Sequence, residues 1–164
     1  MATIRTETTI DASPEDVWGA LRDWGALHTR LVPGFVTDTR LDGGDRIVTF
    51  FNGVVVRERL VTRDDVARRL VWSVVDGPYT HHNGAAQVLL DADGTTRFVW
   101  TADLLPDEAA ERTKAMMEQG TAAIRRTFSG LQDQQSPRVP SSTSAPRTSH
   151  RPPVRAPATR WAAA

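Results

Sequence analysis

The chain has 164 residues, of which 40% are hydrophobic and 24% charged, a composition typical of one ordinary globular domain. It contains no cysteine, which excludes disulfides, thiolate metal sites and a cysteine nucleophile. Basic and acidic residues number 20 each, but five arginines and only one aspartate follow residue 130, so the part before it carries 15 basic against 19 acidic residues. This balance argues against a nucleic-acid-binding surface there.

No stretch of about 18 apolar residues occurs, and the first residues lack the basic and then apolar profile of a secretory signal. We therefore expect a cytoplasmic protein with no stable membrane insertion.

The N-terminal third predicts a strand followed by two short helices. Residues 3–10 alternate Ile and Thr with charged residues, as a half-buried strand does. Ser13 before Pro14 is a helix start signal and predicts a helix over residues 14–22. A second short helix is predicted over residues 24–31, where Pro33-Gly34 ends it.

Beyond Pro33 the apolar residues recur with a period of two, which predicts six further strands. Their ranges are 35–41, 46–51, 54–62, 69–75, 82–90 and 97–104. The connections are short and contain turn residues such as Asn52-Gly53, so consecutive strands are expected to pair as antiparallel hairpins.

Residues 107–131 predict one long amphipathic helix, with an acidic first turn and with Arg125 and Arg126 near its end. The elements together predict an α+β fold in which a seven-stranded curved antiparallel sheet wraps around this helix. Since one helix cannot cover the whole sheet, we expect an apolar cavity whose mouth is capped by the two short helices.

Residues 132–164 contain six of the ten prolines, among Ser, Thr, Ala and Arg. Such a composition cannot bury a core and predicts a disordered tail after a domain over residues 1–131. The alternative is an Arg/Pro-rich docking segment anchored by Trp161.

Several local phrases accompany this order of elements. They are residues 10–18 (IDASPEDVW), Asp23-Trp24 through Pro33-Gly34, residues 57–60 (RERL), and Trp100-Thr101 before residues 103–106 (DLLP). Over residues 3–130 the chain resembles the START-like (helix-grip) superfamily, in particular its bacterial polyketide cyclase/dehydrase and lipid-transport (SRPBCC) branch. The superfamily includes ligand carriers, lipid-transfer modules, cyclases and chaperone activators, so the resemblance implies a pocket without choosing an activity.

Glu58 and a histidine are the candidate reactive groups. Strand alternation places Glu58 on the same face as Val56, and we expect it to point inward. There it would act as a general base or bind a ligand hydroxyl, or alternatively pair with a neighbouring Arg or His to close a polar gap. Either His81 or His82 faces the same side, as a proton donor to a polyketide-like ketone or as polar lining.

The other candidate ligand-binding residues are aromatic, thioether or small residues expected on pocket-facing elements. They are Trp24, His28, Trp72, Tyr79, Asn83, Trp100, Met116, Met117 and Gly120. The large rings predict a pocket of modest volume, suited to a small aromatic or short acyl ligand. Without a metal-binding motif or a phosphate-binding Gly-rich loop, no metal or cofactor is expected.

Three functions follow as hypotheses. The first is binding or carriage of a small hydrophobic or aromatic molecule. The second is a cyclase or dehydrase that uses Glu58 as base and a pocket histidine, with His82 the candidate, as acid. The third is a protein-interaction module of the chaperone-activator kind, which would use the outer surface. The sequence leaves the choice between binding and catalysis open, and the oligomeric state also.

Overall fold

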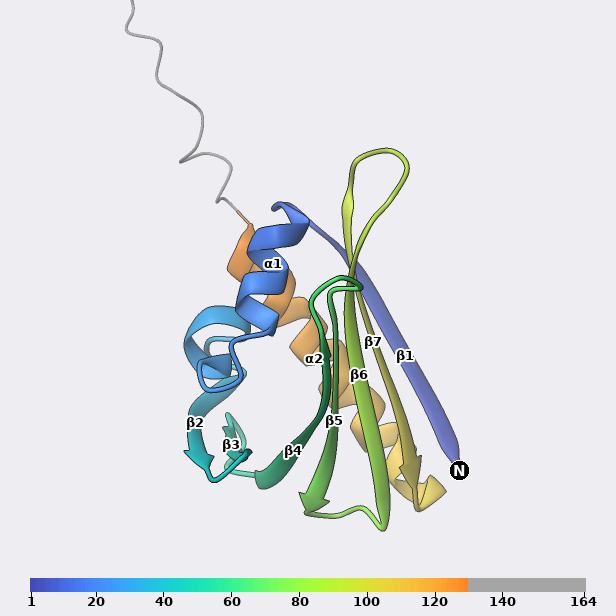
Figure 1. Ribbon diagram of the computed structural model, residues 1–164. Coiled ribbons are helices and arrows are strands. Elements are labelled where there is room, and N and C mark those ends of the chain that lie inside the picture. The colour runs from blue at the N-terminus through green and yellow to red at the C-terminus, as the bar shows by residue number, and fades with distance from the viewer. Residues whose placement is uncertain (130–164) are drawn as a thin grey trace, which may run out of the picture.

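A computed structural model describes residues 1–129 of the chain, and its elements follow the predicted order (Figure 1). The elements are β1 (Ala2–Ile10), α1 (Pro14–Leu21), η1 (Leu27–Leu31), β2 (Val36–Asp42), β3 (Asp45–Phe50), β4 (Val55–Asp64), β5 (Arg69–Asp76), β6 (His81–Leu90), β7 (Thr96–Leu105), η2 (Asp107–Ala109) and α2 (Ala110–Phe128). The predicted α+β helix-grip architecture is confirmed.

The seven strands form one sheet in the order β1-β7-β6-β5-β4-β3-β2, with every neighbouring pair antiparallel. This order results from hairpin connections between consecutive strands, with β1 added beside β7. Figure 1 shows α2 lying across one face of the curved sheet, and α1 contacts η1 and β6.

The second short helix differs from its prediction. Instead of residues 24–31, only Leu27–Leu31 is helical, as a single π-helical turn closed by the Val32 N–H donating to the Leu27 carbonyl. Gly25 lies in the predicted range, and its low helix propensity accounts for the shortened element.

The long helix begins with the 3₁₀ turn η2 and ends at Phe128, where the Ser129 N–H caps the carbonyls of Arg125 and Arg126. The last two positions of the predicted helix, residues 130 and 131, and the predicted tail with Trp161 lie outside the described residues. None of the helices within residues 1–129 is long and apolar enough to cross a membrane.

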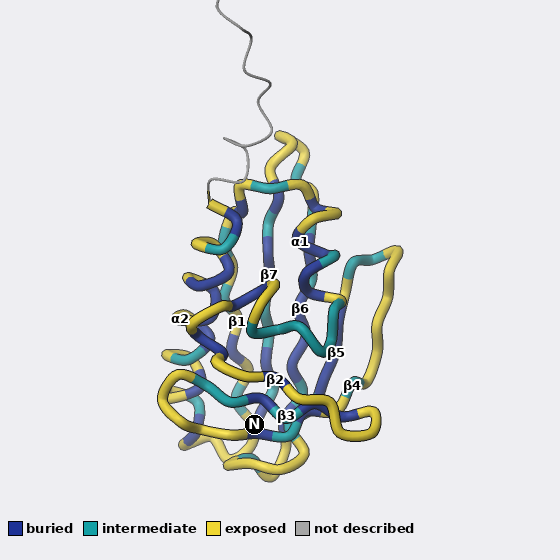
Figure 2. The backbone as a smooth tube through the Cα atoms, turned by 90° about the vertical axis from the view of Figure 1, so that its left-hand side faces the viewer, coloured by how far each residue is buried: buried dark blue, intermediate teal, exposed yellow. Residues whose placement is uncertain are grey.

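The core lies between the concave face of the sheet, α2 and α1. Figure 2 shows buried positions on the inward side of α2, on α1 and along the central strands. Val17 of α1, Phe98 of β7 and Ile124 of α2 are almost completely buried in the main cluster. A smaller cluster includes Leu104 and Met117.

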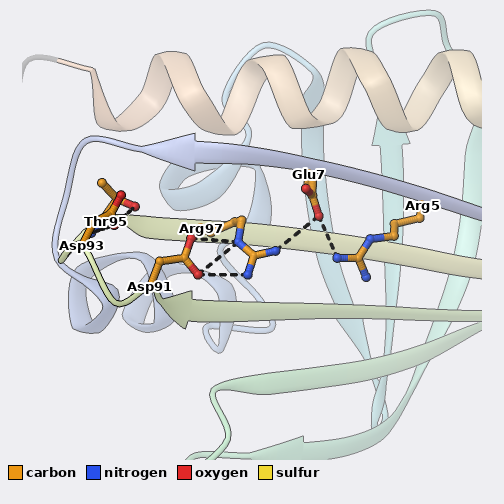
Figure 3. Close-up of polar contacts among 6 residues, drawn as sticks. All are labelled: Arg5, Glu7, Asp91, Asp93, Thr95 and Arg97. Atoms are coloured by element: carbon orange, nitrogen blue, oxygen red, sulfur yellow. Dashed lines mark hydrogen bonds and ion pairs between the residues drawn. The ribbon is translucent and has the colours of Figure 1, made fainter.

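A polar network on the surface links β1 to β7 (Figure 3). The Arg97 guanidinium donates from Nε and Nη2 to Asp91 and reaches Glu7, which also accepts from Arg5. These side chains are between one-third and about one-half exposed, so the network is expected to contribute little to stability.

Candidate functional site

A cavity of about 290 Å³ lies between α2 and the strands β4 to β7. Its walls are mostly aliphatic and aromatic, and a few polar groups converge on it. The volume is at the lower end of the range for small-molecule sites, in line with the predicted modest size.

The mouth of the cavity is not where the sequence predicted it. Its exposed lining residues are Asn52, Val54, Pro78 and Arg112, which come from the β3–β4 turn, the β5–β6 loop and the first turn of α2. In Figure 1 these three segments lie toward the end of the molecule opposite α1.

The two short helices close the other side of the core. There Leu21, Leu27 and Leu31 border a second space of only about 60 Å³. This side is filled because α1 and η1 turn their apolar side chains into the core. The prediction that these helices cap the mouth is therefore wrong.

Two glycines make room for the tryptophans of the cavity wall. Trp72 packs over Gly84 of the neighbouring strand, where an added Cβ would lie 2.7 Å from the indole. Trp100 packs against Gly120 of α2, where a Cβ would lie 2.8 Å from the Trp100 ring and 3.0 Å from Phe35. Gly120 therefore shapes the cavity by leaving space for Trp100, although it does not line the cavity itself.

Glu58 points inward and forms a buried ion pair with Arg46, its direct cross-strand partner. Arg46 Nε donates to the carboxylate oxygen Oε2 at 2.7 Å, and Nη2 lies 2.6 Å from the same oxygen. The guanidinium lies 3.6 Å from the centroid of the Trp24 ring and donates to the Trp24 carbonyl at 3.4 Å. Burial lowers the pKa of Arg46, and the Glu58 charge opposes that shift.

Of the two histidines, His82 lines the cavity. Its Nδ1 accepts a hydrogen bond from the Val74 N–H at 3.2 Å, and its ring lies 5.0 Å from that of Tyr79. Burial lowers the pKa of His82, the Glu58 carboxylate opposes this, and His81 adds to the lowering. The imidazole is therefore neutral at neutral pH, and because Nδ1 accepts, its proton is on Nε2.

The structure places seven of the predicted ligand-binding residues in the cavity wall. These are Glu58, Trp72, Tyr79, His82, Trp100, Met116 and Met117.

Five others are not part of this wall. Trp24 packs on Arg46, His28 lies in η1, and Gly120 is behind Trp100. His81 and Asn83 flank His82 in β6 and face the other side of the sheet because side chains alternate along a strand.

Nine residues of the wall were not predicted from the sequence. The apolar ones are Phe35, Phe50, Val54, Val56, Val74 and Pro78, and the polar ones are Asn52, Arg112 and Thr113. Helical spacing could have found two of these, since Arg112 and Thr113 lie one turn before Met116 and Met117 on the same face of α2.

The site combines an apolar cavity with one ion-paired carboxylate and one neutral imidazole. Such a cavity can enclose a small apolar molecule and orient it through a few hydrogen bonds. Across residues 1–129, His, Asp and Glu side chains form no cluster of three or more that could hold a metal ion.

Comparisons with known proteins agree with this geometry. XoxI from Bacillus cereus is similar in structure, with a TM-score of 0.72 and 24% identity over 80% of this chain and 99% of that chain. A Thermobifida fusca protein is 31% identical over 77% of this chain and 89% of its own, with a TM-score of 0.62.

A point mutant of norcoclaurine synthase from Thalictrum flavum, in complex with a transition-state analogue, shares the fold at 18% identity, with a TM-score of 0.61 over 81% of this chain and 96% of that chain. Among curated proteins, none matches the chain. The model of the family described as polyketide cyclase/dehydrase and lipid transport matches residues 1–133. The chain therefore belongs to this family, and the family supports a ligand-binding function.

Proposed function

We propose that the protein binds or carries a small hydrophobic or aromatic molecule in the 290 Å³ cavity. The observation that carries this proposal is an interior space that is walled mainly by apolar side chains and has a mouth lined by exposed residues. At roughly 30 Å³ per water molecule, the space has room for about ten waters. It therefore suits a one- or two-ring aromatic compound better than a long-chain lipid.

The wall combines rigid and adaptable parts. Trp72 and Trp100, whose ring centroids are 6.0 Å apart, provide a broad aromatic surface for stacking. Met116 and Met117 face the cavity from α2, and their flexible thioethers can adjust to ligands of different outline.

Binding of naphthalene tests the proposal, with tryptophan fluorescence and calorimetry as the two readouts. Met116→Trp puts a bulky indole ring into the cavity and is expected to weaken naphthalene binding at least about tenfold, which corresponds to ~1.4 kcal/mol. Gln119→Trp adds the same ring to an exposed position of α2 and is expected to leave affinity unchanged. Equal affinities of both variants and the wild type would contradict binding in this cavity.

A cyclase- or dehydrase-type enzyme is the second candidate, because Glu58 and His82 line one cavity and could exchange protons with a bound ketone. The ion pair of Glu58 with Arg46 favours binding, since the carboxylate is already paired with a buried guanidinium. If Glu58→Gln abolishes turnover of a polyketide-like ketone without changing its affinity, the enzyme is supported. A ketone recovered unchanged from the wild type supports the carrier. A protein-interaction module, the third hypothesis, would use the outer surface and would need neither Glu58 nor His82 to point inward.

A further inference from the structure

Three polar atoms of the inner cavity wall have no hydrogen-bond partner within residues 1–129, namely Glu58 Oε1, His82 Nε2 and Trp72 Nε1. The Arg46 Nε hydrogen bond and the Nη2 ion-pair contact both go to Oε2 of Glu58, and no hydrogen bond from this range reaches Oε1. Nδ1 of His82 is occupied by the Val74 N–H, which leaves Nε2 free within the same range. None of the three atoms is sealed from solvent, so all three remain open to a ligand.

The other N–H and O–H donors of the inner wall are used or closed. Thr113 donates its proton to the Ala109 carbonyl, so the Tyr79 hydroxyl must be the donor in its 2.8 Å bond with Thr113. Trp100 Nε1 also lacks a partner in the described part of the chain, but it is sealed from solvent. The free donors are therefore His82 Nε2–H and Trp72 Nε1–H, and the free carboxylate acceptor is Glu58 Oε1.

The sheet brings Glu58 Oε1 and His82 Nε2 to either side of one position. Glu58 of β4 is the cross-strand partner of Val74 in β5, and the Val74 N–H bonds to His82 of β6. Two strand spacings, about 10 Å, separate the backbones that carry Glu58 and His82. Both side chains line the cavity, so they can reach one ligand group that lies above Val74.

One ligand group that both donates and accepts a hydrogen bond satisfies this pair, and a hydroxyl is the smallest such group. An ether accepts from His82 but gives nothing to Glu58, and a hydrocarbon leaves both atoms unpaired. A carboxylate at this position would bring a second negative charge beside Glu58, whose charge Arg46 already balances, while His82 is neutral. Among residues 1–129, the one cation of the wall, Arg112, lies at the exposed mouth. Each of these ligands leaves a desolvated polar group without a partner or places two like charges together, and either result lowers its affinity.

We propose that the cavity selects neutral aromatic alcohols, with the ligand hydroxyl donating to Glu58 Oε1 and accepting from His82 Nε2–H. This inference rests on the proposed function and specifies the class of ligand at that same site. Since hydrogen bonds to charged groups are the strong ones, the hydroxyl is expected to raise affinity about tenfold to one hundredfold.

The test compares naphthalene, 2-naphthol, 2-methoxynaphthalene and 2-naphthoate by calorimetry with the wild-type chain. The expected order of affinity places naphthol first by about tenfold or more, with the ether, the hydrocarbon and the carboxylate behind it. His82→Asn supplies the matched variant, because the Asn Oδ1 can still accept from the Val74 N–H while the Nε2–H donor is gone. It is expected to lose most of the naphthol preference, measured within the variant as the ratio of its naphthol affinity to its naphthalene affinity.

The outcomes separate the two proposals. If naphthalene and naphthol bind equally well, or if naphthoate binds most tightly, the hydroxyl inference is overturned while the binding function stands. If no compound binds, both are overturned. Should His82→Asn fail to fold, the order of the four ligands on the wild type still decides the inference.

Discussion

Replacing Gly120 with alanine tests the packing that shapes the cavity. In a helix interior this substitution normally stabilises a protein by about 1 kcal/mol. At Gly120 the new Cβ would lie 2.8 Å from Trp100 and 3.0 Å from Phe35, which requires both rings to move. Overpacking of this kind costs about 1–3 kcal/mol. The net expectation therefore ranges from no change to a loss of about 2 kcal/mol.

Gly19→Ala is the matched control for Gly120→Ala, because a Cβ at Gly19 of α1 meets only Arg30, at 3.6 Å. This variant should gain up to about 1 kcal/mol, so urea unfolding should separate the two variants by about 1–3 kcal/mol. For a domain of this size, 1 kcal/mol moves the melting temperature by about 4 °C. If Gly120→Ala stabilises as much as Gly19→Ala, the reasoning about Trp100 is refuted.

Three further predictions concern charged groups. Arg46→Met leaves the Glu58 carboxylate buried without its partner and should cost about 3–5 kcal/mol in urea unfolding, most of which the added change Glu58→Gln should restore. A double variant as unstable as the single one would contradict this. Because burial lowers the pKa of folded His82 below its ordinary value of 6.5, the unfolded state takes up a proton first as the pH falls. Wild-type stability should therefore decline relative to His82→Asn from about pH 7.5 downward until the folded pKa is passed, and parallel pH profiles of melting temperature would refute the assignment. Glu7→Gln, which removes the charge that contacts Arg5 and Arg97, should lower the melting temperature only slightly in low salt and even less in high salt, and a large, salt-independent loss would be inconsistent with an exposed network.

Most of the fold could be predicted from the sequence because each element carries a local signal. Alternation in residues 54–62 is enough to orient Glu58 inward, and Ser13-Pro14 marks the start of α1. Such signals depend on neighbours in the chain, and hairpin connections then determine the order of the strands.

Details that depend on register between strands were not predictable in the same way. Arg46 pairs with Glu58 across twelve residues, and nothing near Arg46 in the sequence identifies its partner. Which of His81 and His82 faces the cavity depends on how β6 pairs with its neighbours. Two adjacent histidines in the sequence do not reveal this pairing. The position of the cavity mouth was predicted wrongly because Asn52 was interpreted only as part of a turn.

The most direct test of the central claim is to locate naphthalene on the protein by nuclear magnetic resonance. We predict intermolecular contacts from the bound ring to the methyl groups of Met116, Met117 and Val74, which face the cavity. The methyl group of Ala122, on the exposed side of α2, should show none. Contacts confined to Ala122 or other outer positions, with none to the three cavity methyl groups, would contradict the account.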